Sequence, residues 1–214
     1  MDRIDILCSY LEGCKTFADV GCDHGYCTLY MLKNGLCESA VISDVSAKCL
    51  QKAETLLKNY IKEGKAASVC CDGLEKISAD TDEVLIAGMG GDEIVSILKK
   101  SFIPKKFVFQ PMKNSRAVRE YLLLNGAGII TDEIFESYGK FYSVIKGTRK
   151  GNTVKYSEAQ LEYGLALEGE SAQRFLKSEL DKKLGYLERP LGSADRAEIE
   201  KKVNLIRGVL KDER

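Results

Sequence analysis

The sequence predicts an α/β fold in which a mostly parallel sheet carries helices on both faces and is followed by a helical tail. Two observations predict it. Between residues 17 and 149, short β-rich apolar runs alternate with helix-like segments, and each run is closed by Gly, Asp or Pro. After Gly151 these runs stop, and the chain becomes rich in Glu, Lys, Leu and Ala. Because strand–helix–strand units pair in parallel, we expect the first region to form one open sheet.

The strands expected from these runs are short. They lie at 17–21, 40–45, 67–71, 83–89 and 106–111, with helices expected at 26–33, 46–61, 92–99 and 115–124. Ser46 is the expected N-cap of the second helix. Residues 126–150 then show two β-rich runs separated by Ser-Tyr-Gly-Lys, which predicts a hairpin with an antiparallel strand at the edge of the sheet. Ordinary dinucleotide-binding halves lack such a strand, whereas the seven-stranded, Rossmann-like class I methyltransferase fold has it.

The tail is expected to form a separate unit. In 170–188 and 194–211, apolar residues recur at helical spacing, which predicts two antiparallel helices that meet on narrow apolar stripes. We therefore expect a methyltransferase-like domain over residues 1–151 and a helical, coiled-coil-like domain over residues 152–214.

Composition restricts the classes of function. The chain has 32 basic and 32 acidic residues, so its formal net charge is zero and any nucleic-acid surface has to be a local patch. No window approaches the ~18 apolar residues of a membrane span, and the N-terminus lacks a signal-peptide core, so we expect a cytoplasmic protein without membrane contact. All eight cysteines lie within the first 71 residues at spacings that match no common zinc site, so we expect reduced thiols and no metal.

The stretch Asp19–Cys27 lies where the first strand turns into the first helix. Its two glycines, Gly21 and Gly25, allow positive φ and close approach of a ligand to the backbone. The stretch resembles the acidic-x-Gly-x-Gly-x-Gly loop of methyltransferases with Asp23 in place of the middle glycine, and it fits a dinucleotide loop less well. An aspartate repels a pyrophosphate but suits the ammonium and sulfonium groups of S-adenosylmethionine. A plain glycine turn is the alternative.

Further acidic residues close the next two strands. Asp44, followed by Val45, lies 23 residues beyond Gly21, where a Rossmann-type fold binds ribose hydroxyls. A helix-start aspartate is the alternative for Asp44. The third strand is closed by Asp72, Gly73 and Leu74, which fit a contact with an adenine amino group. Three acidic strand ends in order favour a nucleotide-like cofactor.

The fourth strand ends in a glycine-rich segment made of Ala87, Gly88, Met89, Gly90 and Gly91. This segment lies next to the point where the strand order of an open α/β sheet reverses and ligands bind. A wall with few side chains would let a base and a cofactor methyl group both come close. A flexible turn before the next helix is the alternative.

His24 is the only histidine in the chain. No serine or cysteine is set around it in a recognisable nucleophile motif, so a catalytic triad is not expected. We expect His24 to form hydrogen bonds beside the cofactor instead.

Together these motifs resemble those of the bacterial tRNA (adenine-N1)-methyltransferases that modify the adenine at position 22. The resemblance extends over most of the first 150 residues, and the tail is similar to that family's coiled-coil-like C-terminal domain. The motifs that carry it are Ala18-Asp19-Val20-Gly21, Asp23-His24-Gly25-Tyr26, Asp72-Gly73-Leu74, Ile86-Ala87-Gly88-Met89-Gly90-Gly91, Gln110-Pro111, Arg119 with Leu122 and Asn125-Gly126, and Gly139-Lys140-Phe141-Tyr142. Met112 departs from the pattern, because a small polar residue is expected there.

The resemblance implies an enzyme that transfers a methyl group from S-adenosylmethionine to N1 of an adenine in tRNA. Since N1 already carries a lone pair, alignment with the sulfonium methyl group contributes most to catalysis and no strong base is needed. Asp23 is the candidate catalytic residue, as a carboxylate that stabilises the cationic product or accepts the N6 proton. The residues expected to contact the cofactor are Asp19, Gly21, Asp23, His24, Gly25, Asp44, Val45, Asp72, Gly73, Leu74, Ala87, Gly88, Met89 and Gly90.

A tRNA substrate would need residues that bind an unstacked adenine. N1 lies on the Watson–Crick edge, so the adenine has to leave its stack and enter a pocket. Tyr26 and Tyr142 are the candidates for stacking on it, and burial in the core is the alternative for both. Gln110 is expected to read the adenine edge, and Arg119 to contact the substrate. Lysines and arginines in residues 152–214 favour a tRNA clamp, and no obligate protein partner is expected.

Three competing hypotheses stay open at this point. A methyltransferase that acts on another RNA or on a small molecule would share every cofactor residue. A non-catalytic RNA-binding protein with the same fold is the second hypothesis. A nicotinamide-dependent oxidoreductase is the third, and both Asp23 and the terminal hairpin disfavour it.

Overall fold

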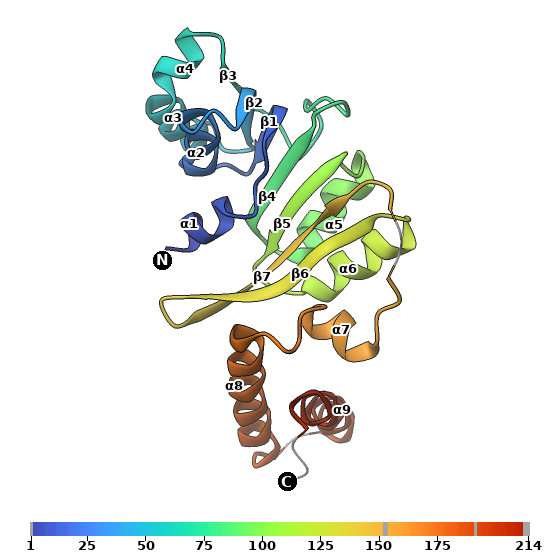
Figure 1. Ribbon diagram of the computed structural model, residues 1–214. Coiled ribbons are helices and arrows are strands. Elements are labelled where there is room, and N and C mark those ends of the chain that lie inside the picture. The colour runs from blue at the N-terminus through green and yellow to red at the C-terminus, as the bar shows by residue number, and fades with distance from the viewer. Residues whose placement is uncertain (1, 152–153, 191, 212–214) are drawn as a thin grey trace.

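The computed structural model describes residues 2–151, 154–190 and 192–211. It contains a seven-stranded sheet in the order β3-β2-β1-β4-β5-β7-β6 (Figure 1). Strands β1 to β5 pair in parallel, whereas β7 is antiparallel to both of its neighbours. The predicted class I methyltransferase fold is confirmed.

The elements of the sheet region follow the predicted order. The strands are β1 (Cys14–Val20), β2 (Cys37–Asp44), β3 (Ala66–Cys70), β4 (Glu83–Met89) and β5 (Lys106–Pro111), then the hairpin of β6 (Gly128–Ser137) and β7 (Lys140–Thr148). The helices are α1 (Arg3–Cys8), α2 (Tyr26–Lys33), α3 (Ala47–Leu56), α4 (Lys58–Lys62), α5 (Gly91–Lys100) and α6 (Ser115–Leu124).

Two helical features differ from the prediction. The single helix expected at 46–61 is divided at Leu57, whose φ of −95° and ψ of 11° leave the helical region. The Leu57 side chain is fully buried, so the chain bends where this leucine is anchored in the core. The six-residue helix α1 was not predicted at all, because it is too short to show a periodic apolar pattern.

Two apolar cores cover the two faces of the sheet, because neighbouring side chains of a strand point to opposite faces. On β1, Phe17 joins a cluster with Leu7 of α1 and Met31 of α2. Its neighbour Ala18 joins a cluster with Ile94 of α5 and Val118 of α6. Asp19 points to the same face as Phe17, toward α1 and α2, and this places the buried carboxylate beneath the N-terminal helices.

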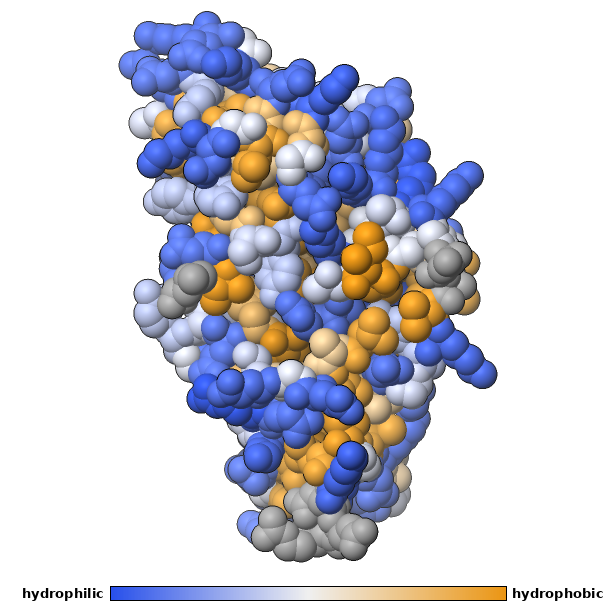
Figure 2. Space-filling model, in the orientation of Figure 1, coloured by the Kyte–Doolittle hydropathy of each residue, from blue (hydrophilic) through white to orange (hydrophobic). Residues whose placement is uncertain are grey.

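The tail forms three helices, α7 (Glu158–Tyr163), α8 (Glu170–Leu187) and α9 (Ser193–Leu210). Helices α8 and α9 bury Leu176, Leu180, Val203 and Ile206 against each other, as their spacing predicts. Figure 2 shows partly buried hydrophobic residues in the lower part of the molecule, where Figure 1 places these two helices. The division into domains at residues 151 and 152 stays a prediction, and residues 152–153 lie outside the described part of the chain.

The tail packs against the sheet region through aromatic and polar contacts. Phe175 at the start of α8 contacts Phe141 of β7, with 5.6 Å between ring centroids. Arg174 pairs with Glu136 of β6 at 2.6 Å. Among the described residues, no helix has the length and apolar character of a membrane span.

Candidate functional site

A cavity of about 330 Å³ opens at the carboxyl ends of β1 and β4. These strands lie side by side where the strand order reverses, which is the place predicted for a ligand. Six of the residues predicted to contact the cofactor line it: Asp19, Gly21, Asp23, His24, Ala87 and Gly88. Tyr26, predicted to contact the substrate, lines it as well. Helix α1 contributes Arg3, Ile4 and Leu7, which the sequence did not indicate.

The loop after β1 has a left-handed backbone at alternate positions. Gly21, Asp23 and Gly25 have φ values of 71°, 44° and 74°. Glycine adopts such values freely, and aspartate tolerates them better than most residues. A Cβ atom at position 21 would lie 2.2 Å from the Cε methyl group of Met89, so the Met89 side chain would have to move to admit it. Gly25 packs closely against Ala53 of α3.

Asp19 is the buried acid of the cavity. Its side chain is 5% exposed, and its Oδ2 atom accepts a hydrogen bond from the Thr28 hydroxyl at 2.9 Å. Burial raises the pKa of Asp19 to about 7, because the charged form loses its hydration, and the negative charge of Asp44 adds to the rise. The Thr28 hydrogen bonds act in the opposite direction and are the weaker effect. A bound cation beside Asp19 would therefore stabilise the ionised carboxylate, which burial has deprived of water.

Arg3 is the cation of the same cavity. Its Nη1 atom donates to the Gln110 Oε1 atom at 2.7 Å, and its guanidinium lies 5.8 Å from the centre of the Tyr142 ring. Within the described part of the chain, Arg3 pairs with no carboxylate. The sequence does not reveal this role, because 107 residues separate Arg3 from Gln110 and the short helix α1 shows no pattern.

The cavity thus presents one cation and one buried acid beside a wall of backbone. A zwitterionic α-amino acid group carries the two complementary charges, and Arg3 and Asp19 match its carboxylate and its ammonium. The N-terminus of α2 adds N–H groups without a side-chain cap, which favour the carboxylate further. Gly21 and Gly88 leave room for a larger group to continue along the strand ends.

The outer rim of the cavity holds Asp23, His24 and Tyr26. The Asp23 carboxylate pairs with Lys52 of α3 at 3.2 Å and lies 3.5 Å from the His24 Nε2 atom. The His24 and Tyr26 rings are stacked, with 5.4 Å between their centroids. Tyr26 is 51% exposed, so the core alternative for this residue is wrong and its ring is free to meet a ligand. The catalytic role of Asp23 and the hydrogen-bonding role of His24 stay predictions.

The acidic groups at the ends of β2 and β3 lie outside this cavity. The Asp44 Oδ1 atom accepts from the backbone N–H of Ser46 at 2.8 Å, in the turn that opens α3, and Val45 between them is 68% exposed. Asp72 pairs with Lys100 of α5 at 2.8 Å. Gly73 packs on Ile97 and Leu74 is buried, so both help to fix this turn. Their contacts with a cofactor stay predictions.

The loops after β4 and β5 are tied together by backbone hydrogen bonds. The Met112 N–H donates to the Met89 carbonyl, and the Gly91 N–H donates to the Lys113 carbonyl, each at 2.8 Å. A Cβ atom at position 91 would lie 2.1 Å from the carbonyl oxygen of Asn114, so the two loops require a glycine here. Gly90 lies between these contacts, half-buried.

Gln110 does not face the cavity. It is fully buried, its Oε1 atom is occupied by Arg3, and its Nε2 atom donates to the Pro111 carbonyl at 3.2 Å. The prediction that Gln110 reads a base edge directly is wrong in this structure, and Gln110 positions Arg3 instead. Met112, which departs from the family pattern, covers both residues and is 52% exposed.

The prediction that Arg119 contacts the substrate is also wrong. Arg119 is fully buried and binds Asp132 with two hydrogen bonds of 2.7 and 2.9 Å. Its Nη1 atom donates to the carbonyls of Leu161 and Glu162 in α7, each at 3.2 Å. Arg119 therefore joins α6, β6 and α7, and solvent does not reach it. Tyr142 is half-buried, between Phe135 and Arg3, so its stacking role stays a prediction.

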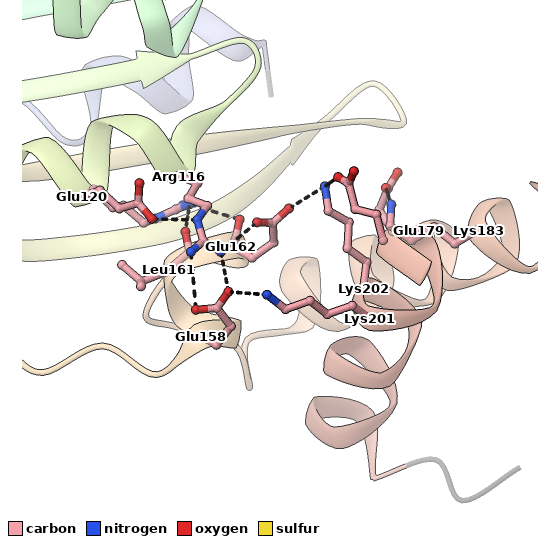
Figure 3. A network of polar contacts seen from close by, with 11 residues as sticks. Arg116, Glu120, Glu158, Leu161, Glu162, Glu179, Lys183, Lys201 and Lys202 are labelled. Carbon is pink, nitrogen blue, oxygen red and sulfur yellow. Dashed lines mark hydrogen bonds and ion pairs between the residues drawn. The ribbon is translucent and has the colours of Figure 1, made fainter. Parts of the chain in front are cut away.

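Four lysines of the tail, where basic residues suggested a tRNA clamp, are paired with carboxylates, and so is Arg116 of α6. Figure 3 shows Arg116 of α6 bound to Glu120, Glu158 and Glu162, and Lys201 and Lys202 of α9 bound to the same acids of α7. Lys182 and Lys183 of α8 both pair with Glu179. This network joins the tail to α6, and it neutralises much of the positive charge that the sequence assigned to a clamp.

All eight cysteines are free thiols. Cys22 and Cys27 line the cavity, and burial raises the pKa of the Cys22 thiol, so it is a poor nucleophile. Within residues 2–151, 154–190 and 192–211, no cluster of three His, Cys, Asp or Glu side chains is arranged to hold a metal ion.

The geometry can now be compared with known proteins. Residues 1–145 match the family described as a methyltransferase domain. The chain belongs to this family. A Mycoplasma pneumoniae (strain ATCC 29342 / M129 / Subtype 1) protein, provisionally named a tRNA methyltransferase, is 34% identical over 153 residues, covering 70% of this chain and 71% of that protein.

Two further comparisons agree with this family. The tRNA (adenine(22)-N(1))-methyltransferase of Bacillus subtilis (strain 168) is 26% identical over 168 residues, which cover 76% of this chain and 71% of that protein. The structure of M. capricolum TrmK, in complex with S-adenosyl-homocysteine, has a TM-score of 0.89 and 20% identity, and the match covers 99% of this chain and 98% of that one. The structural likeness shows a shared fold that includes the tail. The resemblance to the bacterial tRNA (adenine(22)-N1)-methyltransferases is confirmed.

Proposed function

We infer that this protein transfers a methyl group from S-adenosylmethionine to N1 of the adenine at position 22 of tRNA. The observation that carries this proposal is the cavity at the ends of β1 and β4, where Arg3 and Asp19 present opposite charges beside Gly21 and Gly88. Membership of a methyltransferase family whose relatives bear tRNA methyltransferase names supports it.

The residues of the site fit S-adenosylmethionine. Its methionyl end is a zwitterion, which suits Arg3 and Asp19, and its sulfonium is a cation, which suits the acidic rim at Asp23. The ribose lies toward Asp44 in this proposal, because the second carboxylate oxygen of Asp44 has no hydrogen bond among the described residues. The adenine amino group would reach Asp72 only in competition with Lys100.

Methyl transfer to adenine N1 depends on the alignment of the reacting atoms more than on acid–base catalysis. When bound, the cofactor supplies an electrophilic methyl group on its sulfonium. Adenine N1 supplies the lone pair, so the protein has to hold N1 in line with that methyl group and to exclude water. The loops Met89–Gly91 and Met112–Asn114, which backbone hydrogen bonds tie together, follow the cavity residue Gly88 and would support this part of the site. Asp23 lies on the rim, where a carboxylate would stabilise the positive charge that methylation leaves on the adenine ring.

The target adenine has to be turned out of the tRNA and stacked on an aromatic ring. Tyr26 is our first candidate, because it lines the cavity and half of its surface is free. Tyr142 does not line the cavity, but its ring lies next to Arg3, which does, and it is the second candidate. Contacts of the tail with the rest of the tRNA are a proposal that rests on its position beside β6 and β7.

A transfer assay tests the proposal. The protein is incubated with S-adenosylmethionine labelled in its methyl group and with unmodified tRNA transcripts that carry either adenine or guanine at position 22. We expect label in the adenine transcript alone. Equal labelling of both transcripts would refute the assignment to position 22, and no labelling of either would refute the tRNA substrate.

A further inference from the structure

The turn of the β6–β7 hairpin carries a residue that the fold does not favour. Tyr138 and Gly139 form the two-residue turn between Ser137 and Lys140, and both have positive φ, at 48° and 73°. Such turns favour Asn-Gly or Asp-Gly, because both central residues need the left-handed region. A bulky aromatic residue there is an outlier.

Packing does not account for Tyr138. The side chain is 83% exposed, and within the described chain its ring contacts no other aromatic ring. Asn or Gly would therefore fit this turn better than tyrosine does. A largely exposed residue that strains the backbone points to a role outside the fold, such as a contact with a partner.

The register places this turn at the active-site edge of the sheet. Since β7 runs antiparallel to β5 with Phe109 opposite Ile145, the end of β5 at Pro111 lies opposite Ser143, and the residues before Ser143 extend past it. Tyr142 lies under Arg3, which lines the cavity. Tyr138 lies four positions before Tyr142 in the chain, so its Cα atom is at most about 13 Å away at the rise of an extended strand. Figure 1 shows the turn projecting beyond the neighbouring strands on the side where α1 lies.

The turn is followed by a positively charged side chain, Lys140, that a ligand could reach. The Lys140 side chain is exposed, and within the described chain no carboxylate forms an ion pair with it. In contrast, Lys182, Lys183, Lys201 and Lys202 of the tail are all paired with glutamates. The nearby Glu136 is neutralised by Arg174 at 2.6 Å, so it does not cancel the charge of Lys140.

We propose that Tyr138 and Lys140 at the tip of the β6–β7 hairpin form a tRNA contact beside the active site, with Tyr138 stacked on an unpaired base and Lys140 bound to a phosphate. An exposed aromatic ring next to an unpaired lysine is the combination that binds single-stranded RNA. A tip at most about 13 Å from Tyr142 suits nucleotides that flank a turned-out adenine. This inference rests on the proposed function, because it needs tRNA as the substrate.

The test uses the whole protein and measures tRNA binding directly, by fluorescence anisotropy with labelled tRNA. Tyr138→Asn should weaken tRNA binding roughly tenfold, whereas Tyr138→Phe should bind like the wild type, because a phenyl ring also stacks. Lys140→Gln should lower the slope of log affinity against log salt concentration by about one. The control Leu124→Asn alters an equally exposed apolar residue at the end of α6 and should change neither quantity.

Stability and cofactor affinity separate this role from a structural one. Tyr138→Asn should melt at the same temperature as the wild type or higher, because asparagine tolerates the left-handed backbone, and its affinity for S-adenosylmethionine should not change. A lower melting temperature together with weaker cofactor binding would show that Tyr138 serves the fold, and would overturn the proposal. Tyr138→Gly keeps the test valid if the asparagine variant fails to fold.

The outcomes also distinguish the two proposals. If the wild type methylates tRNA and Tyr138→Asn binds tRNA as tightly as the wild type does, the hairpin contact is refuted and the function stands. If the wild type binds tRNA without methylating it, the function is refuted, and the affinities of the variants still decide the hairpin contact. If the wild type binds no tRNA, both proposals fall.

Discussion

At the scale of single residues, the site depends on a buried acid and an arginine that reach one cavity from distant parts of the chain. Asp19 ends a buried strand, so its side chain is held by the sheet and by the Thr28 hydroxyl. Arg3 is held by Gln110 and by the Tyr142 ring. The two charges are therefore oriented before any ligand arrives, which reduces the free energy that binding has to spend on ordering them.

The raised pKa of Asp19 predicts that cofactor affinity depends on pH. With a pKa of about 7, the carboxyl is largely protonated at pH 6 and largely ionised at pH 8. An ammonium group binds the ionised form, so affinity for S-adenosylmethionine should rise from pH 6 to pH 8. Asp19→Asn should bind roughly tenfold more weakly at pH 8. Calorimetric titrations at both pH values measure this, and parallel pH profiles for the two proteins would refute it.

The stability of the unliganded protein should respond with the opposite sign. Folding raises the pKa of Asp19 from its ordinary value of 3.8, so the folded state favours the protonated acid. The contribution of Asp19 to the free energy of unfolding is therefore full below pH 3.8 and is lost as the pH rises through about 7. Asp19→Asn should therefore unfold at higher urea concentration than the wild type at pH 8, and the difference should shrink toward pH 4.

Asp23, which is also a predicted cofactor contact, is expected to affect the methyl-transfer step more than the binding of tRNA. Asp23→Asn keeps the size of the side chain and its tolerance of positive φ but removes the charge. We therefore expect kcat to fall roughly 100-fold while KM for tRNA changes little. Asp23→Ala should give a similar loss. Single-turnover methyl transfer measures the effect. Lys52→Met is the control, because it removes the ion-pair partner of Asp23 and leaves the carboxylate in place. Near-normal turnover in Asp23→Asn would remove Asp23 from the mechanism.

At the scale of elements, the parts that were predicted correctly are those whose sequence signal is local. Apolar runs closed by Gly, Asp or Pro indicated β1 to β5, and Ser-Tyr-Gly-Lys indicated the β6–β7 turn. Helix α1 has too few residues to show a period, so Arg3 was missed. Arg119 was misread for a different reason. Its partner Asp132 is 13 residues away on another element, and a basic residue in a helix gives no sign of burial.

The buried pair of Arg119 and Asp132 is predicted to hold α6, β6 and α7 together. Arg119→Ala leaves the Asp132 carboxylate buried without its partner, so the free energy of unfolding should fall by about 3–5 kcal/mol. The double variant Arg119→Met, Asp132→Leu should recover most of this loss, because no charge stays buried. Urea unfolding measures both. A double variant as unstable as Arg119→Ala would show that the loss comes from packing and not from the unpaired charge.

At the scale of the whole molecule, the tail is fixed to the catalytic region by charge as well as by apolar contacts. The network of Figure 3 links Arg116 of α6 through Glu158 and Glu162 of α7 to Lys201 and Lys202 of α9. Because Arg116, Lys201 and Lys202 are already paired with glutamates, this network offers little free positive charge to a tRNA. The net charge of the whole chain is zero as well. A contact of tRNA with the unpaired Lys140, as proposed above, would therefore not be expected from the composition of the chain.

Removing α8 and α9 is predicted to weaken tRNA binding and to spare the cofactor. A chain that ends at Gly169 keeps α7, whose carbonyls bind Arg119, so the buried pair with Asp132 stays intact. Affinity for tRNA should fall roughly tenfold or more, while affinity for S-adenosylmethionine should stay at the wild-type value. Calorimetry and tRNA binding measure the two. Equal losses in both would refute a role of the tail in holding tRNA.

The central claim is that this cavity methylates N1 of one adenine in tRNA. Unmodified tRNA is incubated with the protein and S-adenosylmethionine, digested, and analysed by mass spectrometry for its methylated nucleoside and the position of that nucleoside. We predict 1-methyladenosine at position 22, and none when Asp23→Asn replaces the wild type at the same short reaction time. A methyl group on another atom or another nucleotide, or none in the wild-type reaction, would contradict this claim.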